Sequence, residues 1–410
     1  MMIKAERTGK AQRDDIAAAV VRGEFEIFQD IEVVPTRHFG SLRILSDGGP
    51  VWPHFDELTG ARHFRRKKAV DALPEPQPGP HLRIDRPCVW GGFAMAHFGH
   101  LIADHLQRLL ESRVLRPDDL FLFILPPNQV PGDLPSYFWL LIEWYGLRRD
   151  QVHFVTEPTI VSELRVMPQA EPYGMTPPST QYMDLLEDNA ARMGVQPIRT
   201  DLVYVGRQGL LAKGKGSHAG ENYLIGVLQQ LGVRVLDPAK ASLAEQVALY
   251  AGAATLIFAE GSALHGRQLL GRLDQKIVVL CRRPGNHVAE AALGVRCREL
   301  VYVDAIRRFV EFHKTSRATR PARGMSFYDL DKVFAVFAGQ GINLSAHWDA
   351  AAFADAEATD ARAWFESFEQ TGRLRKFGRR SALADFAAEG ISLEAEAAEA
   401  EAEAEAEAEA

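Results

Sequence analysis

Two histidines and an aspartate stand at helical spacing in the first third of the chain: His97, His100 and Asp104. Residues three or four apart share one face of a helix, so the imidazole of His100 and the carboxylate of Asp104 are expected to lie side by side. Such a pair can remove a proton from a hydroxyl group, a step that commonly accelerates a reaction roughly 10²–10⁴-fold. The same spacing also suits an Asp–His pair that only ties the helix to a neighbouring loop, and both interpretations stay open.

A second group of polar residues is basic. Arg207 follows the apolar run at 202–205 almost directly, and Lys213 and Lys215 lie in the glycine-rich loop after it. A guanidinium group can bind two phosphate oxygens at once, and an ammonium group adds a mobile point charge. Together they could neutralise a departing diphosphate where no metal does so. The place of Arg207 after a buried strand favours a binding role, whereas Lys215 is interpreted as a solvated loop residue.

The third group is the run Glu-Gly-Ser-Ala-Leu-His at 260–265. Small residues at the start of a helix leave room for a ribose or a phosphate, and Glu260 could accept hydrogen bonds from ribose hydroxyls. Ser262 is equally suited to cap the helix. Glu245, in the first turn of the preceding helix, would also be explained by its favourable interaction with the helix dipole.

The elements that must position these groups alternate along the chain. Strand-like runs at 202–205, 233–236, 255–258 and 277–280 alternate with helical patterns at 221–231 and 243–251. This order is typical of a parallel sheet covered by helices, in which ligands bind at the carboxyl ends of the strands. Because Arg207 and the run at 260–265 both follow strands, we expect them at one sheet edge.

A similar alternation precedes it. Strands are predicted at 88–90, 120–125, 152–155 and 160–167, and helices at 97–113, 137–145 and 181–193. The glycines at 91 and 92 are expected to end the first strand and to let the backbone approach a ligand closely. The sequence therefore predicts an α/β fold in five segments: an irregular, strand-rich region at 1–86, one α/β domain at 87–198, a second at 199–305, a helical extension at 306–390, and a disordered, low-complexity Glu/Ala tail at 391–410.

Charge and composition narrow the setting. The net charge of the 410 residues is −7, but residues 394–410 carry eight glutamates, so the rest is close to neutral, which argues against nucleic acid as a partner. Three cysteines do not make a disulfide framework, and no apolar stretch suits a signal peptide or a membrane span. We therefore expect a cytoplasmic protein. The basic run at 65–68 is interpreted as a solvated loop or as a patch that contacts an anionic glycan or the inner face of the membrane.

Several other kinds of site are disfavoured. The chain has no G-x-G-x-x-G after a strand and no phosphate-binding loop, which weighs against a phosphotransferase. The pair Asp329 and Asp331 resembles the metal-holding carboxylates of many sugar transferases, but it lies outside both α/β units and is better suited to cap a helix. Histidine and cysteine spacings form no zinc set. We expect neither a metal nor a cofactor.

All three groups of residues resemble sequence blocks of one known family. His100, Asp104 and Arg108 form an H-x-x-x-D-x-x-x-R pattern that is similar to a block of glycosyltransferase family 61, often described as capsular polysaccharide biosynthesis proteins. Four further blocks resemble those of the family in the same order: Val-Tyr-Val-Gly-Arg at 203–207, Glu221, Leu-Ala-Glu-Gln-Val at 243–247, and Glu-Gly-Ser-Ala-Leu-His at 260–265.

The resemblance implies a GT-B-like fold, in which two Rossmann-like α/β domains face a cleft. It places the acceptor at 87–198 and the nucleotide sugar at 199–305. It also implies an inverting, metal-independent hexosyl- or pentosyltransferase that acts on a glycan or a lipid-linked acceptor and makes a bacterial capsular or other surface polysaccharide. The alternative is a non-catalytic nucleotide- or glycan-binding component of polysaccharide assembly.

The resemblance also assigns roles to single residues. Asp104 becomes the general base with His100 beside it, and His97 and Arg108 become lining residues of the site. The residues assigned to donor binding are Arg207, Lys213, Glu245, Glu260, Gly261, Ser262 and His265.

Overall fold

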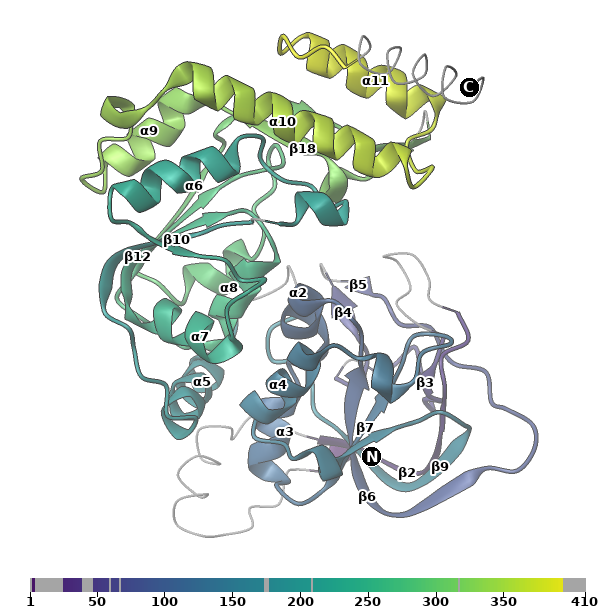
Figure 1. Ribbon diagram of the computed structural model, residues 1–410. Helices are drawn as coiled ribbons and strands as arrows, with labels where there is room; N and C mark the ends of the chain where they lie inside the picture. Colours follow the sequence, from purple (N-terminus) through teal and green to yellow (C-terminus); the bar gives the residue numbers. More distant parts are fainter. Residues whose placement is uncertain are drawn as a thin grey trace.

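The protein is described by a computed structural model that covers residues 2–3, 25–38, 47–58, 60–65, 68–172, 177–207, 209–315 and 318–393. Two separate sheets, each flanked by helices, organise these residues (Figure 1). The predicted α/β class is therefore confirmed. The Glu/Ala tail beyond Leu393 and the two middle residues of the basic run at 65–68 lie outside the described residues.

The first sheet is mixed and has the strand order β1-β2-β9-β6-β7-β8, with β3 beside β2. The pairs β6–β9, β6–β7 and β7–β8 are parallel, whereas β2 runs antiparallel to β9. The region before residue 87 therefore shares a sheet with the first α/β unit. The strands are β1 Met2–Ile3, β2 Phe25–Val34, β3 Gly49–Pro50, β6 Leu82–Phe93, β7 Leu120–Ile124, β8 Val152–Phe154 and β9 Thr159–Val166, and a separate hairpin pairs β4 Phe64–Arg65 with β5 Lys68–Ala69.

The glycines at 91 and 92 do not end their strand as predicted. Strand β6 continues to Phe93, with a shift in register against β7 between Trp90 and Gly92. A Cβ atom on Gly91 would lie 2.5 Å from the ring of Phe123, and Gly92 has a φ of 99°. The glycines therefore allow a bulge and a close approach to a core aromatic ring rather than to a ligand.

The helix predicted at 97–113 is divided. It consists of α2 (Phe98–His100), a π-helical turn η1 (Leu101–His105) and α3 (Leu109–Leu115). The N–H of Leu106 donates to the carbonyl of Leu101 at 2.8 Å, which is an i→i+5 bond. Such π turns often occur at functional sites, because the extra residue redirects the side chains that follow. The other helices of this half are η2 Pro131–Asp133, α4 Ser136–Trp144, η3 Arg149–Gln151 and α5 Thr180–Arg192.

The second sheet is wholly parallel and has the order β11-β10-β12-β13-β14. Its three central strands, β10, β12 and β13, are apolar and largely buried, as expected for a sheet covered on both faces. Strand and helix bounds follow the predicted alternation closely: β10 Thr200–Val205, η4 Leu211–Lys213, α6 Glu221–Gln230, β11 Arg234–Leu236, α7 Leu243–Gly252, β12 Ala253–Ala259, η5 Ser262–Leu269, β13 Lys276–Leu280, α8 Glu290–Gly294 and β14 Glu299–Val303.

The segment after β14 is only partly helical. Short strands come first, and three helices follow them: β15 Ile306–Val310, β16 His313–Thr315, β17 Ala318–Thr319, η6 Pro321–Arg323, β18 Met325–Tyr328, α9 Leu330–Ala338, η7 Ser345–His347, α10 Ala350–Glu369 and α11 Lys376–Ala387. This extension packs on the second sheet, where Tyr328, Phe337 and Phe353 share a core with Leu224 of α6. It lies away from the first sheet (Figure 1).

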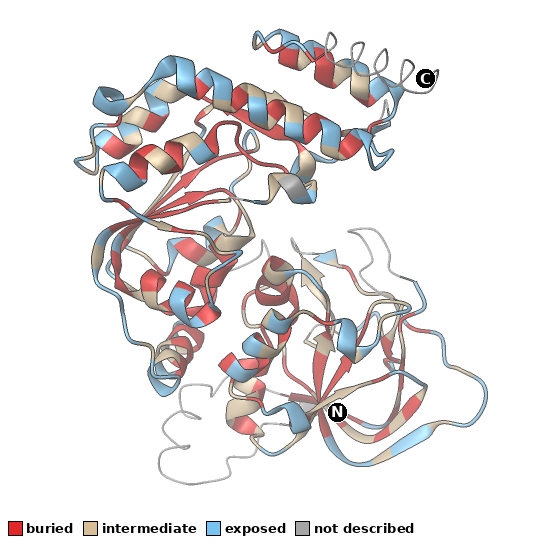
Figure 2. Cartoon of the chain, viewed as in Figure 1, coloured by how far each residue is buried: buried red, intermediate tan, exposed pale blue. Residues whose placement is uncertain are grey.

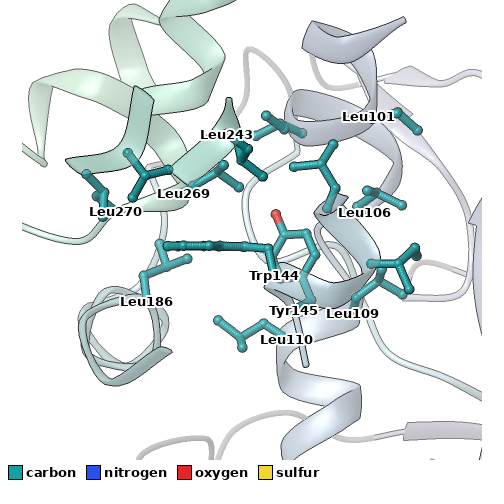
Figure 3. Packing of buried hydrophobic residues seen from close by; sticks show 14 of the residues in the cluster. Leu101, Leu106, Leu109, Leu110, Trp144, Tyr145, Leu186, Leu243, Leu269 and Leu270 are labelled. Carbon is teal, nitrogen blue, oxygen red and sulfur yellow. The ribbon is translucent and has the colours of Figure 1, made fainter. Parts of the chain in front are cut away.

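The two halves are joined by a common apolar core. Leu109 and Trp144 of the first half pack in one cluster with Leu186 of α5 and with Leu243 and Leu269 of the second half (Figure 3). Buried residues line the inner faces of the helices in both halves (Figure 2). The packing fixes the halves against each other at one end of their junction. Within the described residues, no helix is long and apolar enough to span a membrane.

A buried ion pair adds to this joint. Arg296 is fully buried, and its Nη2 lies 2.9 Å from Oε1 of Glu171, which belongs to the connection that leaves the first half. The same guanidinium also donates to the carbonyl of Leu270 from its Nε, at 3.2 Å. Moving the two halves apart would leave these buried charges unpaired, so the ion pair favours the arrangement seen here.

Candidate active site

His100 and Asp104 form the contact that their spacing predicts. Nδ1 of His100 lies 2.8 Å from Oδ2 of Asp104, and the two side chains are 33% and 0% exposed, respectively. The carboxylate is therefore sealed inside the protein, whereas the imidazole reaches the surface. A group from solvent can therefore approach the imidazole of His100 but not the carboxylate of Asp104.

Asp104 stays ionised although it is buried. Burial by itself would raise the pKa of the carboxyl group, but the hydrogen bond from His100 and the charge of the nearby Arg65 leave that pKa below its ordinary value. Nε of Arg65 lies 2.9 Å from Oδ1 of Asp104. Each carboxylate oxygen therefore faces its own cationic or N–H partner.

His97 stands at the start of α2 and caps it. Its Nδ1 accepts the backbone N–H of His100 at 3.3 Å, and the two imidazole rings lie 4.3 Å apart. Although His97 is exposed, desolvation by the surrounding protein atoms lowers its pKa to about 4, and the nearby His100, Lys215 and His265 act in the same direction. His97 is thus a neutral imidazole beside His100 at neutral pH.

The start of α2 lies against the start of η5 from the second half. A Cβ atom on Gly99 would lie 2.9 Å from Cδ2 of His265 and 3.1 Å from Cβ of Ser262. Burial lowers the pKa of His265 to about 4, and its Nδ1 lies 2.5 Å from Oε1 of Gln268. Ser262 makes no capping hydrogen bond, because Gly261 occupies the position before η5. Because Gly99 has no side chain, Ser262 and His265 can pack closely against the start of α2, which carries His97 and His100.

Arg207 packs against Gly261, the residue before Ser262. A Cβ atom on Gly261 would be 1.9 Å from Nη1 of Arg207, so the guanidinium rests directly on this glycine. Nη2 of Arg207 donates to the carbonyl of Gly216 at 2.9 Å. Burial lowers the pKa of Arg207, and Glu221 and Glu260 oppose that shift, but a guanidinium keeps its charge at neutral pH. The consecutive residues Gly261 and Ser262 thus connect Arg207 to the histidines of α2.

Glu221 sets the backbone at the end of β10. Its Oε1 accepts the N–H of Arg207 at 2.9 Å and the hydroxyl of Tyr204 at 3.0 Å. Burial raises the pKa of Glu221, and these donors and the charge of Arg207 oppose that shift. The glutamate noted for the family resemblance therefore orients the residue that we expect to bind phosphate.

Two predicted donor-binding glutamates are placed differently. Glu260 is fully buried, and its carboxylate accepts hydrogen bonds from the backbone of Arg282 at 2.8 Å, from Nε of Arg283 at 2.7 Å and from Asn286 at 2.7 Å. It ties the end of β12 to the loop after β13 and offers no oxygen to a ribose. Glu245 is 45% exposed in its side chain and lies 3.9 Å from Arg234. Among the described residues, no contact connects it to Gly261.

The two lysines of the basic loop both lie at the surface. Lys213 ends η4 and is exposed, and the structure gives it no contact with the histidines within the described residues. Lys215 is exposed as well, but its charge contributes to the lowered pKa of His97. Lys215 is therefore a surface residue, as its interpretation as a solvated loop residue predicts.

Comparison with protein families agrees with this geometry. Residues 98–267 match the family model described as Glycosyltransferase 61. This segment belongs to glycosyltransferase family 61. The family supports glycosyl transfer as the general activity, with a nucleotide sugar and a glycan as the general classes of donor and acceptor. No curated protein sequence matches the chain.

The family 61 segment begins in α2 and ends in η5, so it contains both sides of the junction. Arg108 belongs to it but does not line the site. It is 3% exposed, and its guanidinium donates to the carbonyls of Ala61 at 2.9 Å and of Arg62 at 2.6 Å. It therefore lies behind the His100–Asp104 pair and holds a segment outside the family match.

Two further features lie away from the family 61 junction. Asp329 caps α9, where its carboxylate accepts the N–H of Lys332 at 3.4 Å, as the capping interpretation predicts. Of the His, Cys, Asp and Glu side chains in the described ranges, no three gather so that they could hold a metal ion. An open depression of about 490 Å³ near Thr200, Gln229 and Leu249 lies at the start of β10, opposite the end that carries Arg207.

Proposed function

We propose that this protein is an inverting, metal-independent glycosyltransferase that moves a hexosyl or pentosyl group from a nucleotide sugar to a glycan or lipid-linked acceptor. The product would be a capsular or other surface polysaccharide of a bacterium, made in the cytoplasm with peripheral contact to the inner face of the membrane. One observation carries the proposal: Gly99 of α2 packs against Ser262, and Arg207 packs against the preceding residue Gly261. The partly exposed His100, backed by Asp104, and the guanidinium of Arg207 thus approach the same turn from the two halves of the protein. Two such units facing each other fit a GT-B-like arrangement.

In this mechanism His100 is the general base. Its Nδ1 faces Asp104, so Nε2 is the nitrogen that takes the proton from the acceptor hydroxyl. The hydroxyl oxygen forms the new bond to the anomeric carbon as the bond to the diphosphate oxygen breaks on the opposite side, which inverts the configuration. Asp104 stabilises the imidazolium that results. The role that the family resemblance implies for Asp104 thus becomes one of orientation, because its carboxylate is sealed.

The departing diphosphate would lie at the carboxyl ends of β10 and β12. Arg207 offers a planar group with paired N–H donors, and Lys215 adds a mobile positive charge. Both charges balance the negative charge that grows on the leaving oxygen, as electrostatic stabilisation requires. Gly261 keeps a side chain out of the space that the guanidinium of Arg207 occupies.

Replacing Gly261 with alanine tests whether the guanidinium of Arg207 binds the diphosphate from its position against Gly261. The new methyl group would meet Nη1 of Arg207, which is the far end of a flexible side chain, so the guanidinium would move and the fold would remain. We expect nucleoside diphosphate binding to weaken about tenfold, which corresponds to the loss of one charge-assisted hydrogen bond. Calorimetry measures the binding, and thermal unfolding provides the control. Unchanged binding would show that Arg207 does not act from the position described here.

The alternative is a component of polysaccharide assembly that binds a nucleotide or glycan without catalysis. The placement of Glu245 and Glu260 favours it, because two of the residues expected to bind the donor do not face Gly261 or Ser262. Thermal shift with UDP, GDP and CMP separates the two functions. A protein that is stabilised by none of the three fits a glycan-binding component and not a transferase.

Release of nucleotide tests the proposed function directly. Nucleotide sugars are incubated one at a time with the protein and with candidate acceptor glycans, and protein-dependent release of the nucleotide is measured with and without EDTA. We expect at least one donor to be consumed and EDTA to have no effect. Strict dependence on magnesium would contradict the proposal and support a phosphotransferase-like mechanism.

A further inference from the structure

We propose that the hairpin of β4 and β5, which lies outside the family 61 match, completes the catalytic centre: Arg65 is a positioning residue for Asp104, and Arg108 holds the segment that leads into the hairpin. This inference rests on the proposed function. It assigns a role to a basic run that the sequence indicates only as a surface feature. It also explains Arg108, the arginine of the H-x-x-x-D-x-x-x-R pattern, as a residue that supports the hairpin and does not contact a substrate.

The contact between Arg65 and Asp104 is buried. Nε of Arg65 lies 2.9 Å from Oδ1 of Asp104, and the two side chains are 11% and 0% exposed. His100 occupies the other carboxylate oxygen at 2.8 Å. Ion pairs at such sites are weakly screened by solvent, so Arg65 and His100 act on the carboxylate together. Arg65 therefore contacts Asp104, and Asp104 contacts the partly exposed imidazole of His100.

The hairpin cannot hold this position by itself. It pairs only two residues with two, Phe64 with Ala69 and Arg65 with Lys68, and so short a hairpin is not stable alone. Gln169 fastens it from the first half: its Oε1 accepts the N–H of Phe64 at 2.7 Å, and its Nε2 donates to the backbone carbonyl of Asp104 at 3.1 Å. One amide group thus joins the hairpin to the residue that Arg65 contacts.

Arg108 provides the second attachment. Its two terminal nitrogens donate to the carbonyls of Ala61 and Arg62, the residues just before β4. Burial lowers the pKa of Arg108 to about 10, with the charges of Asp71 and Glu26 opposing the shift, so the group remains a cation at neutral pH. Removing it would release the chain four residues before Arg65.

The π turn directs a ring against the same segment. His105, the last residue of η1, stacks on His63 with ring centroids 5.1 Å apart and planes at 28°. Burial lowers the pKa of His63 to about 3, and the charges of Arg108 and Arg65 act in the same direction. Burial likewise lowers the pKa of His105 well below its ordinary value. Both rings are neutral, so two stacked imidazoles and two arginines can pack together without strong repulsion.

The charge of Arg65 has a consequence for His100. The titratable groups that face Asp104 are His100, Arg65, His105 and His265. Arg65 balances the negative charge of the carboxylate, and without it that charge would favour the protonated form of His100. A base must be unprotonated to accept a proton, so loss of Arg65 should move the acidic limb of the rate–pH profile to higher pH.

Two substitutions at Arg65 test the inference. Arg65→Met removes the charge and keeps the apolar length of the side chain, and Arg65→Lys keeps the charge but not the planar guanidinium group. For Arg65→Met we expect kcat to fall roughly 10²-fold because the base is misplaced, and the acidic limb of the rate–pH profile to move to higher pH. For Arg65→Lys we expect the acidic limb of the rate–pH profile to stay where it is in the parent, and kcat to lie between those of the parent and Arg65→Met. Affinity for nucleoside diphosphates should remain at the parent value in both.

Arg83→Met is the matched control. Arg83 lies on β6 with a side chain that is 50% exposed, and it pairs with Asp30 and Asp85 away from the junction. It should leave both kcat and the profile unchanged. The inference would be overturned if Arg65→Met had the kcat of the parent and the acidic limb of its rate–pH profile did not move. It would also be overturned if kcat fell together with Tm while the acidic limb stayed in place.

A second readout separates this inference from the proposed function. NMR titration of the His100 ring in the parent protein and in Arg65→Met needs no turnover. We expect the ring to take up its proton at higher pH in the variant than in the parent. If the parent releases no nucleotide, the proposed function fails, but the midpoint still decides whether Arg65 acts on His100. Equal midpoints reject the inference even if the parent is an active transferase.

Discussion

Replacing His100 with alanine is expected to reduce kcat roughly 10²–10⁴-fold, the usual contribution of a general base, while nucleoside diphosphate affinity stays at the parent value. The reason is that His100 alone of the pair presents an exposed side chain, with Nδ1 held by Asp104 at 2.8 Å. Without the imidazole, the acceptor hydroxyl would have to lose its proton to water. Single-turnover release of nucleotide, measured at saturating donor and acceptor, gives the chemical step directly.

Asp104→Asn tests the second member of the pair. The amide has nearly the shape of the carboxylate but cannot stabilise an imidazolium, so we expect a loss similar to that in His100→Ala. Residues that act as one unit are not additive, and the double variant should therefore be little worse than either single variant. A His100→Ala protein with nearly full kcat, beside an inactive Asp104→Asn protein, would return the role of base to Asp104. That result would require the sealed carboxylate to open during the reaction.

The local part of this site could be predicted from the sequence. Two residues four apart on a helical pattern must lie on one face, and the His100–Asp104 contact follows from that alone. Arg207 followed an apolar run, and the end of a parallel strand is where such a residue meets a helix start. The second half of the molecule was predictable for the same reason, since its strands are short, buried and separated by regular helices.

The distant part could not be predicted. Arg65 reaches Asp104 only because β2 pairs with β9 and β6 with β9, which brings a hairpin far away in sequence against α2 and η1. The π turn was hidden because the apolar residues Leu101, Leu106 and Leu109 fit an ordinary helical stripe. A single extra residue in a turn leaves the hydrophobic periodicity almost unchanged, although it redirects the side chains that follow.

Glu260 shows a related difficulty. A carboxylate after a buried strand has the right place for a ribose contact, and the sequence shows no reason against it. The donors that occupy it, Arg282, Arg283 and Asn286, come from the loop after the neighbouring strand. Whether a polar group is satisfied inside the protein depends on strand order, which local patterns do not contain.

The C-terminal extension has a role that its helical pattern did not indicate. Gly220 donates its N–H to Asp360 of α10 at 2.8 Å, and Ala219 donates to the carbonyl of Ser326 at 2.8 Å. His218 stacks on Tyr328 with ring centroids 4.3 Å apart. The extension therefore shapes the basic loop that carries Lys215, and the donor side of the site depends on residues well beyond the family 61 match.

Replacing Arg207 is the second change with a large expected effect. For Arg207→Ala we expect affinity for the nucleoside diphosphate of the preferred donor to fall roughly tenfold to a hundredfold, because a hydrogen bond to a charged group contributes about 1.5–3 kcal/mol. The fold should survive, since Glu221 accepts the backbone N–H of residue 207 whatever its side chain. Calorimetry with the diphosphate and with the corresponding monophosphate measures the effect.

Two comparison variants separate geometry from charge. Arg207→Lys keeps the positive charge but cannot bind two oxygens through one planar group, so we expect an affinity between those of the parent and Arg207→Ala. Arg234→Ala removes an equal charge from β11, where the arginine is 52% exposed and pairs with Glu245 at 3.9 Å. It should leave the affinity unchanged. If Arg234→Ala weakens binding as much as Arg207→Ala does, the protein responds only to overall charge, and the diphosphate is not held at Gly261. If Arg207→Ala weakens the diphosphate and the monophosphate equally, Arg207 contacts the phosphate next to the ribose and not the one that leaves the sugar.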